Sequence, residues 1–317
     1  MHAGRPASKR DLLPLRKNGF TEPLSIKDAA TYVVKRQNDD EGYAFCQGME
    51  SNAQDTYYGL ATLHRLKVRF PNPKKTIRWL KEFVPYGLHS SYYVAKAWDL
   101  CGRDLDSGVN KYLQSIHISK TRSDSTSTHG SRAFRPKDVL MITELLNMTR
   151  VETNQKKTTD LLLGYQNRDG GFGLHGQSDL ESTYQVVASL HNLNFPVKSL
   201  KATLEYVRSC EAPTGGFSLI PNTSPPHMEY TYHGASILDL LGEKANNPKL
   251  ARYVFRCQQS NGGFARSEFG ISTFEDTFYA VSVLQKIGRL QKTERKEALL
   301  IPLHLGNKQW MKITREP

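Results

Sequence analysis

The sequence is poor in cysteine and tryptophan, and it lacks any long run of apolar residues. Its four cysteines show no CxxC pairing, which argues against a zinc finger and predicts free thiols in a reducing compartment. No apolar segment approaches the roughly 20 residues that cross a bilayer, so we expect no integral membrane contact. Residues 1–19 are basic and lack the apolar core of a secretory signal, which predicts a cytoplasmic protein. The cysteines are Cys46, Cys101, Cys210 and Cys257.

Acidic residues are scarce relative to basic ones. Lys and Arg total 43 against 31 Asp and Glu, giving a formal net charge of +12. The basic side chains are scattered along the chain, which predicts a solvated surface with weak affinity for anionic surfaces. No nucleic-acid-binding motif accompanies them, so we expect no nucleic-acid partner.

What the chain does contain is a repeat. Three copies combine Gly-Gly-Phe, a short polar loop, and an acidic residue close to a Thr-aromatic pair that opens an apolar segment. The threonines recur at a nearly constant spacing of about 47 residues, and a period of this size indicates a repeat architecture. A more divergent copy occupies residues 40–58. The three clear copies begin at Gly170, Gly215 and Gly262, and their threonines are Thr183, Thr231 and Thr277.

Each repeat predicts an outer amphipathic helix, a glycine loop and an inner buried helix. In one copy, apolar residues recur at helical spacing over 199–210, and Pro213 with the two glycines after it ends this helix. The segment from Glu229 to Leu241 is apolar on most sides, which predicts a buried helix. Two degenerate copies between the first and fourth bring the total to six helix pairs.

Six helical hairpins are enough to close a ring, so the predicted fold class is all-α, an α/α toroid or α6/α6 barrel. The N-terminal ends of the inner helices are expected around one mouth. We expect one toroid domain over 25–290, preceded by a basic arm at 1–24 and followed by a C-terminal tail at 291–317. Two outer helices are expected at Thr76–Phe83 and Leu105–Ile116. The predicted inner helices are Asp55–Leu66, Ser91–Leu100, Asp138–Met148, Ser182–Leu193, Glu229–Leu241 and Asp276–Ile287.

The motif Gln-x-x-[Asp/Asn]-Gly-Gly-Phe at Tyr165–Phe172 and Cys257–Phe264, followed by a Thr-aromatic inner helix, resembles the β subunits of protein prenyltransferases and the squalene/terpene cyclases. The resemblance covers roughly Ile26 to Leu290. It implies an isoprenoid diphosphate or other apolar ligand in a central cavity, with transfer or cyclisation of a prenyl group. The same toroid also serves non-enzymes, so a binding scaffold for a helical partner subunit is the alternative.

The resemblance also implies a metal site at the heads of the fifth and sixth inner helices. Laid without gaps on the Asp-x-Cys motif of the prenyltransferases, His227 and Glu229 take the places of two zinc ligands, and Glu275 takes that of the third. The ligand types differ, but one His and two carboxylates suit zinc or another divalent metal. Alternatively, the two glutamates are first-turn acids that favour the helix dipole.

The loop at 218–226 lacks the cation pair with which the prenyltransferases hold the diphosphate. A substitute basic cluster precedes the third inner helix and contains His129. Convergent cations suit phosphate, so we expect the cluster to bind a diphosphate at the same mouth, with a solvated basic loop as the alternative. The residues predicted to bind substrate in this way are Arg132, Arg135 and Lys137.

A cyclase activity is suggested by Thr273–Phe278, which resembles the Asp-x-Asp-Asp-Thr of the protonating cyclases. Glu275 takes the place of the proton-donating acid, and Asp276 is the neighbour expected to polarise it, which makes these two the catalytic candidates. The first Asp of that motif is Thr273 here, and the cyclases are usually larger, with a second domain.

Tyrosines recur in the first turns of the predicted inner helices. An aromatic funnel suits a long apolar ligand and attracts carbocationic charge, whereas the alternative is that these rings fill the barrel. A carbohydrate-active toroid with paired carboxylates, Asp179 with Glu181 and Glu275 with Asp276, is disfavoured because no tryptophan lies near those loops. The tyrosines predicted to bind substrate are Tyr58, Tyr184, Tyr232 and Tyr279.

Overall fold

Helices dominate the computed structural model, which describes residues 26–46, 48–102, 135–149, 155–223, 225–245 and 247–290. The outer helices are α1 (Ile26–Val34), α3 (Pro73–Glu82), α8 (Gln155–Leu163), α10 (Lys201–Ser209) and α12 (Pro248–Arg256). The inner helices are α2 (Ala53–Arg65), α4 (Gly87–Leu100), α7 (Pro136–Thr149), α9 (Leu180–Asn192), α11 (Met228–Leu240) and α13 (Phe274–Lys286). A short 3-10 helix η2 (Val197–Ser199) precedes α10, and strands β1 (Phe264–Ala265) and β2 (Ser272–Thr273) pair antiparallel.

All six predicted inner helices are present, and the all-α toroid is confirmed. Each begins slightly before its predicted start, most clearly α4, because the helix includes the residues just after its N-cap. The outer helix predicted for Leu105–Ile116 lies outside the described residues, as do the arm at 1–24 and the tail at 291–317. The domain boundaries therefore stay a prediction.

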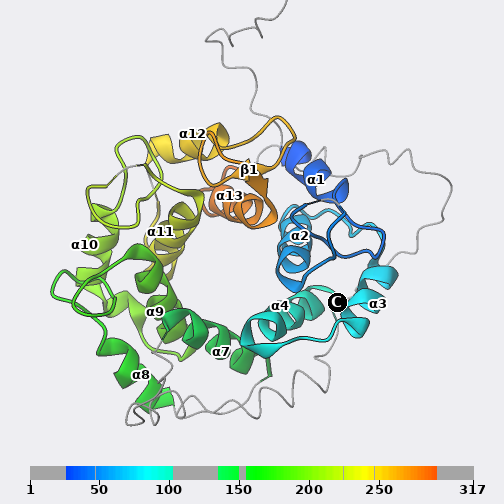
Figure 1. The fold of residues 1–317 in the computed structure, drawn as a ribbon. Coiled ribbons are helices and arrows are strands. Elements are labelled where there is room, and N and C mark those ends of the chain that lie inside the picture. The colour runs from blue at the N-terminus through cyan, green and yellow to red at the C-terminus, as the bar shows by residue number, and fades with distance from the viewer. Residues whose placement is uncertain are drawn as a thin grey trace, which may run out of the picture.

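The inner helices close into a ring. Each packs against the next in the order α2, α4, α7, α9, α11 and α13, and α13 then packs against α2. The outer helices lie around this ring (Figure 1). In the described part of the chain, neighbouring outer-to-inner connections are joined by hydrogen bonds such as Leu180 N–H to the Leu219 carbonyl and Met228 N–H to the Arg266 carbonyl, both 2.8 Å, so the first turns of these inner helices share one face.

The regular spacing within the repeat has a structural cause. The aromatic residue after the glycines is fully buried, as for Phe172, and its backbone N–H donates to the hydroxyl of the threonine in the next inner helix, here Thr183 Oγ1 at 2.9 Å. A buried N–H needs such an acceptor, which fixes the loop to the helix. The same bond joins Tyr43 to Thr56, Phe217 to Thr231 and Phe264 to Thr277.

Glycine is required where one repeat touches the next. Gly262 has φ +90°, and a Cβ there would lie 2.3 Å from the carbonyl oxygen of Asp28 in α1. Gly170 makes the equivalent approach to Ala202 of α10. The last loop therefore seats on the first outer helix, which closes the outer layer of the ring as well as the inner one.

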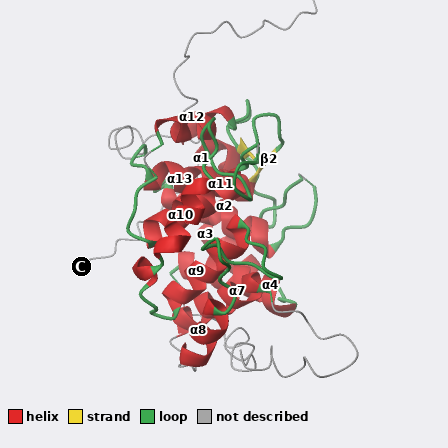
Figure 2. Ribbon diagram, turned by 90° about the vertical axis from the view of Figure 1, so that its left-hand side faces the viewer, coloured by secondary structure: helices red, strands yellow, loops and turns green. Residues whose placement is uncertain are grey.

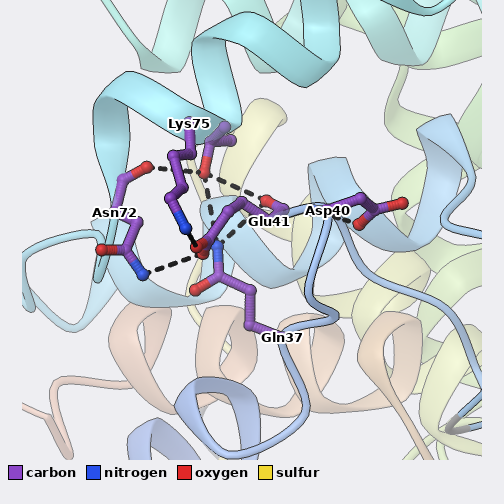
Figure 3. A network of polar contacts seen from close by, with 7 residues as sticks. Gln37, Asp40, Glu41, Asn72 and Lys75 are labelled. Carbon is purple, nitrogen blue, oxygen red and sulfur yellow. Dashed lines mark hydrogen bonds and ion pairs between the residues drawn. The ribbon is translucent and has the colours of Figure 1, made fainter. Parts of the chain in front are cut away.

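The divergent first repeat replaces this glycine with Glu41, which keeps a left-handed backbone at φ +68°. Its buried carboxylate binds two residues at the start of α3, accepting from Lys75 Nζ at 3.0 Å and from Asn72 Nδ2 at 2.8 Å (Figure 3). Gln37 Nε2 donates to the Glu41 carbonyl at 3.0 Å. A polar clamp therefore links the loop to the next outer helix where the other copies use close backbone contact.

Candidate functional site

Three glutamates occupy first turns at the mouth of the ring: Glu181 on α9, Glu229 on α11 and Glu275 on α13. Burial raises the pKa of Glu229 to about 7, and the negative charges of Glu181 and Glu275 add to the effect. The carboxyl group of Glu229 is therefore within electrostatic reach of the other two. A carboxyl group with this pKa can give or take a proton near neutral pH.

Glu275 stands at the top of a tyrosine network. Its Oε1 accepts from the hydroxyl of Tyr58 at 2.9 Å and from that of Tyr279 at 2.8 Å, and its Oε2 accepts from Gln54 Nε2 at 3.4 Å. The Tyr58 hydroxyl also lies 3.2 Å from that of Tyr93. Helices α2, α4 and α13 thus position one carboxylate with several donors, an arrangement that holds its charge in place.

Asp276, the other predicted catalytic residue, is engaged at the helix cap. Its Oδ2 accepts from Thr273 Oγ1 at 2.8 Å, and its N–H donates to the same hydroxyl at 2.9 Å. Burial raises its pKa to about 6 against the effect of that hydrogen bond. Among the hydrogen bonds of the described residues, none joins Asp276 to Glu275, so the predicted polarising contact is not among them.

His227 is the N-cap of α11, yet its side chain makes no capping bond. The N-caps Asn52, Asp179 and Thr273 do cap their helices. His227 Nδ1 instead accepts from Arg266 Nε at 3.1 Å, and both burial and the Arg266 charge lower its pKa. The imidazole is therefore neutral near pH 7.

Arg266 is a functional candidate that the sequence analysis missed. Besides His227, it donates through Nη2 to the hydroxyl of Tyr230 at 3.3 Å and lies over that ring. A signal was present, because Arg266 stands two residues after the motif aromatic. The other copies have apolar residues there, namely Phe45, Leu174 and Leu219.

The predicted metal set is not assembled. Within the described ranges, no group of three His, Cys, Asp or Glu side chains is placed to hold a metal ion. His227 Nδ1 already accepts from Arg266, and the oxygens of Glu275 accept from tyrosines and Gln54. In this arrangement His227, Glu229 and Glu275 do not form a ligand group for zinc or another divalent ion, and metal binding at the mouth has only the resemblance behind it.

The predicted basic cluster is placed only in part. Lys137 is exposed at the mouth, where its charge acts to lower the pKa of Glu229 and of His89. Arg135 is exposed and pairs with Asp138 at 3.2 Å, and Arg132 lies outside the described residues. Diphosphate binding by these cations stays a prediction.

Aromatic side chains from five inner helices form a continuous belt inside the ring. Tyr232 stacks on Tyr279 with ring centroids 4.6 Å apart, and its hydroxyl lies 3.4 Å from that of Tyr184. Tyr58 contacts Tyr279 and Tyr93 at 5.8 and 5.5 Å between centroids. The four tyrosines predicted to bind substrate therefore belong to one aromatic surface, which suits an apolar ligand.

His233 interrupts this belt and was not predicted. It is 4% exposed and stacks on Tyr184 with centroids 4.5 Å apart. Burial lowers its pKa to about 3, so the ring is neutral. Its Nδ1 has no hydrogen-bond partner within the described part of the chain. A neutral imidazole thus faces rings in the middle of the aromatic belt.

The sequence matches the prenyltransferase alpha-alpha toroid domain family over residues 12–83 and 108–306. The chain belongs to this family. Geranylgeranyltransferase-I of Candida albicans, solved with GGPP, is similar with a TM-score of 0.60 at 13% identity, over 82% of this chain and 90% of that one. Apo type II terpene cyclase MstE from Scytonema gives 0.51 at 12% identity, over 83% and 96%.

A solved variant of a glycosidase is also similar, with a TM-score of 0.56 at 9% identity over 83% of this toroid and 96% of that chain. At such identities the likeness establishes the fold alone. In the present chain, Asp179 caps α9 by accepting from the Ser182 N–H at 2.7 Å, and Glu181 accepts from Gln185. The Asp179–Glu181 pair of the carbohydrate-active alternative is therefore divided between a helix cap and a hydrogen bond to the buried side chain of Gln185.

Among the helices that the structure describes, none combines the length and the apolar character that crossing a bilayer demands.

Proposed function

We infer that this toroid binds an isoprenoid or other elongated apolar ligand along its aromatic interior, with the reacting end at the carboxyl groups of the mouth. The observation that carries the proposal is the belt of rings from five inner helices that leads directly to Glu275. Two solved structures of similar fold add support, because geranylgeranyltransferase-I was solved in complex with GGPP and an MstE variant in complex with geranylgeranyl dihydroxybenzoate. Both of these ligands contain a long prenyl chain.

Proton transfer to and from the prenyl chain is the chemistry that the mouth supports best. Glu229, with a pKa of about 7, carries a proton that it can donate to an alkene carbon. The cation so formed faces the rings of Tyr232 and Tyr279, which attract positive charge. Loss of a proton to the Glu275 carboxylate restores the alkene, so the net reaction is an isomerisation or cyclisation without another reactant.

Deuterium exchange tests this proposal. Geranylgeraniol and geranylgeranyl diphosphate are incubated with the protein in heavy water, and the recovered chains are examined by mass spectrometry. We expect deuterium or a cyclised product with the wild type and neither with Glu229→Gln, which should still bind the chain. Glu205→Gln on the exposed face of α10 is the matched control and should behave as wild type. Failure of the wild type to bind either chain would overturn the proposal.

A scaffold function remains the second candidate because of the apolar rim at the mouth. The exposed large hydrophobic side chains of the described residues all lie on connections that lead into inner helices. Figure 2 shows long loops and β2 on one side of the ring. An exposed apolar rim of this kind suits a partner protein. The rim residues are Phe45, Met49, Val84, Tyr86, Leu174, Ile220, Phe269 and Ile271.

Sedimentation separates the two candidates. A rim that normally meets a partner should make the isolated chain self-associate, and Phe269→Ser with Ile271→Ser should reduce this while leaving ligand affinity unchanged. If the rim only frames the entrance to the ring, the double substitution should leave sedimentation unchanged and should slow ligand uptake.

A further inference from the structure

A charged pair lies among the aromatic rings, away from the mouth. Lys96 Nζ on α4 pairs with Glu144 Oε2 on α7 at 2.5 Å. The same Glu144 oxygen accepts from the hydroxyl of Tyr92 at 2.7 Å. Lys96 also lies over the rings of Tyr57 and Tyr92, at 5.5 and 5.4 Å from their centroids. Nothing in the chemistry at the mouth uses this pair.

Contacts with other helices place the pair inside the ring. Burial acts to lower the pKa of Lys96, but Tyr57 and Glu144 outweigh it and hold the pKa above its usual value, with a further contribution from Tyr232. The charge of Glu144 also raises the pKa of Tyr184. These partners come from α2, α11 and α9, and only the interior of the ring is within reach of all of them.

The pair also lies deep. Lys96 stands near the C-terminal end of α4 (Gly87–Leu100), whereas Glu229 and Glu275 occupy the first turns of their helices. With a rise of about 1.5 Å per residue, this places Lys96 on the order of 10 Å below the mouth. Even so, 25% of the Lys96 side chain and 22% of the Glu144 side chain stay accessible. Both side chains therefore keep surface that water or a ligand can reach.

A hydrocarbon chain is a poor neighbour for this pair. Lys96 remains an ammonium, and displacing water from it with an apolar group leaves donors unsatisfied at a cost. The cation also lies over one face of Tyr57 and one face of Tyr92, so those two faces are not open to a carbocation. An oxygen on the ligand satisfies the accessible donors of the ammonium and removes that cost.

We propose that Lys96 and Glu144 form a distal specificity site that selects an elongated apolar ligand bearing an oxygen at its far end, as a hydroxyl or carboxyl group. The inference rests on the proposed function, since it concerns the opposite end of the same ligand. The Lys96 ammonium donates to the distal oxygen, and Glu144, held by Tyr92, accepts from a hydroxyl. The ligand class is thus an ω-oxygenated isoprenoid or lipid rather than a plain hydrocarbon chain.

The first experiment needs only the wild-type protein and matched ligands. Geranylgeraniol is compared with its ω-hydroxy derivative, and hexadecanol with the corresponding terminal diol, by calorimetric titration. A hydrogen bond to a charged donor corresponds to a gain in affinity of about tenfold or more for the ω-oxygenated member of each pair. Equal affinity within both pairs overturns the inference and leaves the proposed function standing.

Neutralising the pair gives the second measurement. Lys96→Met with Glu144→Gln removes both charges and keeps an acceptor for Tyr92, and removing both partners avoids an uncompensated buried charge. The preference for the ω-oxygenated ligand should fall to less than about threefold while the hydrocarbon-ended chain still binds. A preference that survives in this variant contradicts the assignment.

Lys286→Met with Asp239→Asn is the matched control. This pair also joins neighbouring inner helices, α13 and α11, at 2.6 Å, and its lysine has the same 25% side-chain accessibility. The control should keep the wild-type preference, and its loss would count against a specific role for Lys96. If no chain of either kind binds the wild type, the proposed function itself fails and takes this inference with it.

Discussion

At the residue scale, the state of Glu229 depends on its surroundings. Its pKa is raised from the ordinary 4.5 to about 7, by burial first and then by two neighbouring carboxylates. Between these pH values the folded protein holds a proton that the unfolded chain has lost. The stability that the folded protein has with Glu229 neutral, relative to the charged form, is fully present below pH 4.5 and is lost as the pH rises through about 7. The ionised Glu229 carboxylate therefore destabilises the folded protein.

Glu229→Gln removes that titration. We expect its free energy of unfolding to exceed that of the wild type by about 1–2 kcal/mol above pH 7, after allowance for solvent screening, and to match it below pH 4.5. Urea denaturation at the two extremes measures the difference. A difference in the free energy of unfolding that is the same at both pH extremes would mean that burial does not shift the pKa of Glu229.

His227 gives a second residue-scale prediction. His227→Asn restores a capping side chain at the start of α11, where the histidine provides none, and should stabilise the protein by about 1 kcal/mol. The same change removes the imidazole nitrogen that accepts from Arg266 Nε and so holds this side chain at the mouth. We therefore expect weaker ligand binding. Chemical denaturation and titration with geranylgeraniol are measured together. A loss of stability with unchanged binding would show that the position serves the fold alone.

At the scale of the element, the repeat depends on one hydrogen bond between loop and helix. Thr183→Val keeps the shape of the side chain but leaves the buried N–H of Phe172 without its acceptor. We expect it to lower the free energy of unfolding by about 2 kcal/mol. Denaturant unfolding provides the measurement.

Thr183→Ser is the control for that prediction. It retains the hydroxyl and loses one methyl group, so it should cost only about 1 kcal/mol. If the serine variant were the less stable of the two, packing of the methyl group rather than the hydrogen bond would hold the loop.

At the scale of the whole molecule, the ring is closed by contact between its first and last repeats. Gly262 and Gly288 both have positive φ, +90° and +70°, but they differ in the space around them. A Cβ at Gly262 meets the carbonyl of Asp28 at 2.3 Å, whereas nothing lies within 4 Å of one at Gly288. The two positions therefore separate backbone strain from ring closure.

Gly288→Ala should cost about 1–2 kcal/mol, the strain of a left-handed alanine. Gly262→Ala adds overlap with α1, and we expect about 1–3 kcal/mol more from it. Thermal and urea unfolding of the two variants give the comparison. Equal losses would show that the seam between α1 and the last loop adjusts freely.

Much of the fold could be predicted because its signals are local. Apolar periodicity with glycine punctuation defines each helix pair within one repeat, and all six inner helices follow it. The tyrosines lie inside the ring as expected because each stands near the start of an inner helix, and substrate binding by them stays a prediction. The metal set was predicted from a resemblance, and the geometry of the described residues gives it no counterpart.

The sequence by itself determined the helix pairs, the loops between them and which residues stand at the mouth, because each depends on neighbours within a single repeat. Only the tertiary structure decided which polar groups meet. Tyr58 and Glu275 lie 217 residues apart, Lys96 and Glu144 48, and His227 and Arg266 39. The first contact crosses the seam where closure of the ring packs α13 against α2, and the other two join neighbouring repeats, so no pattern within one repeat specifies which side chains meet.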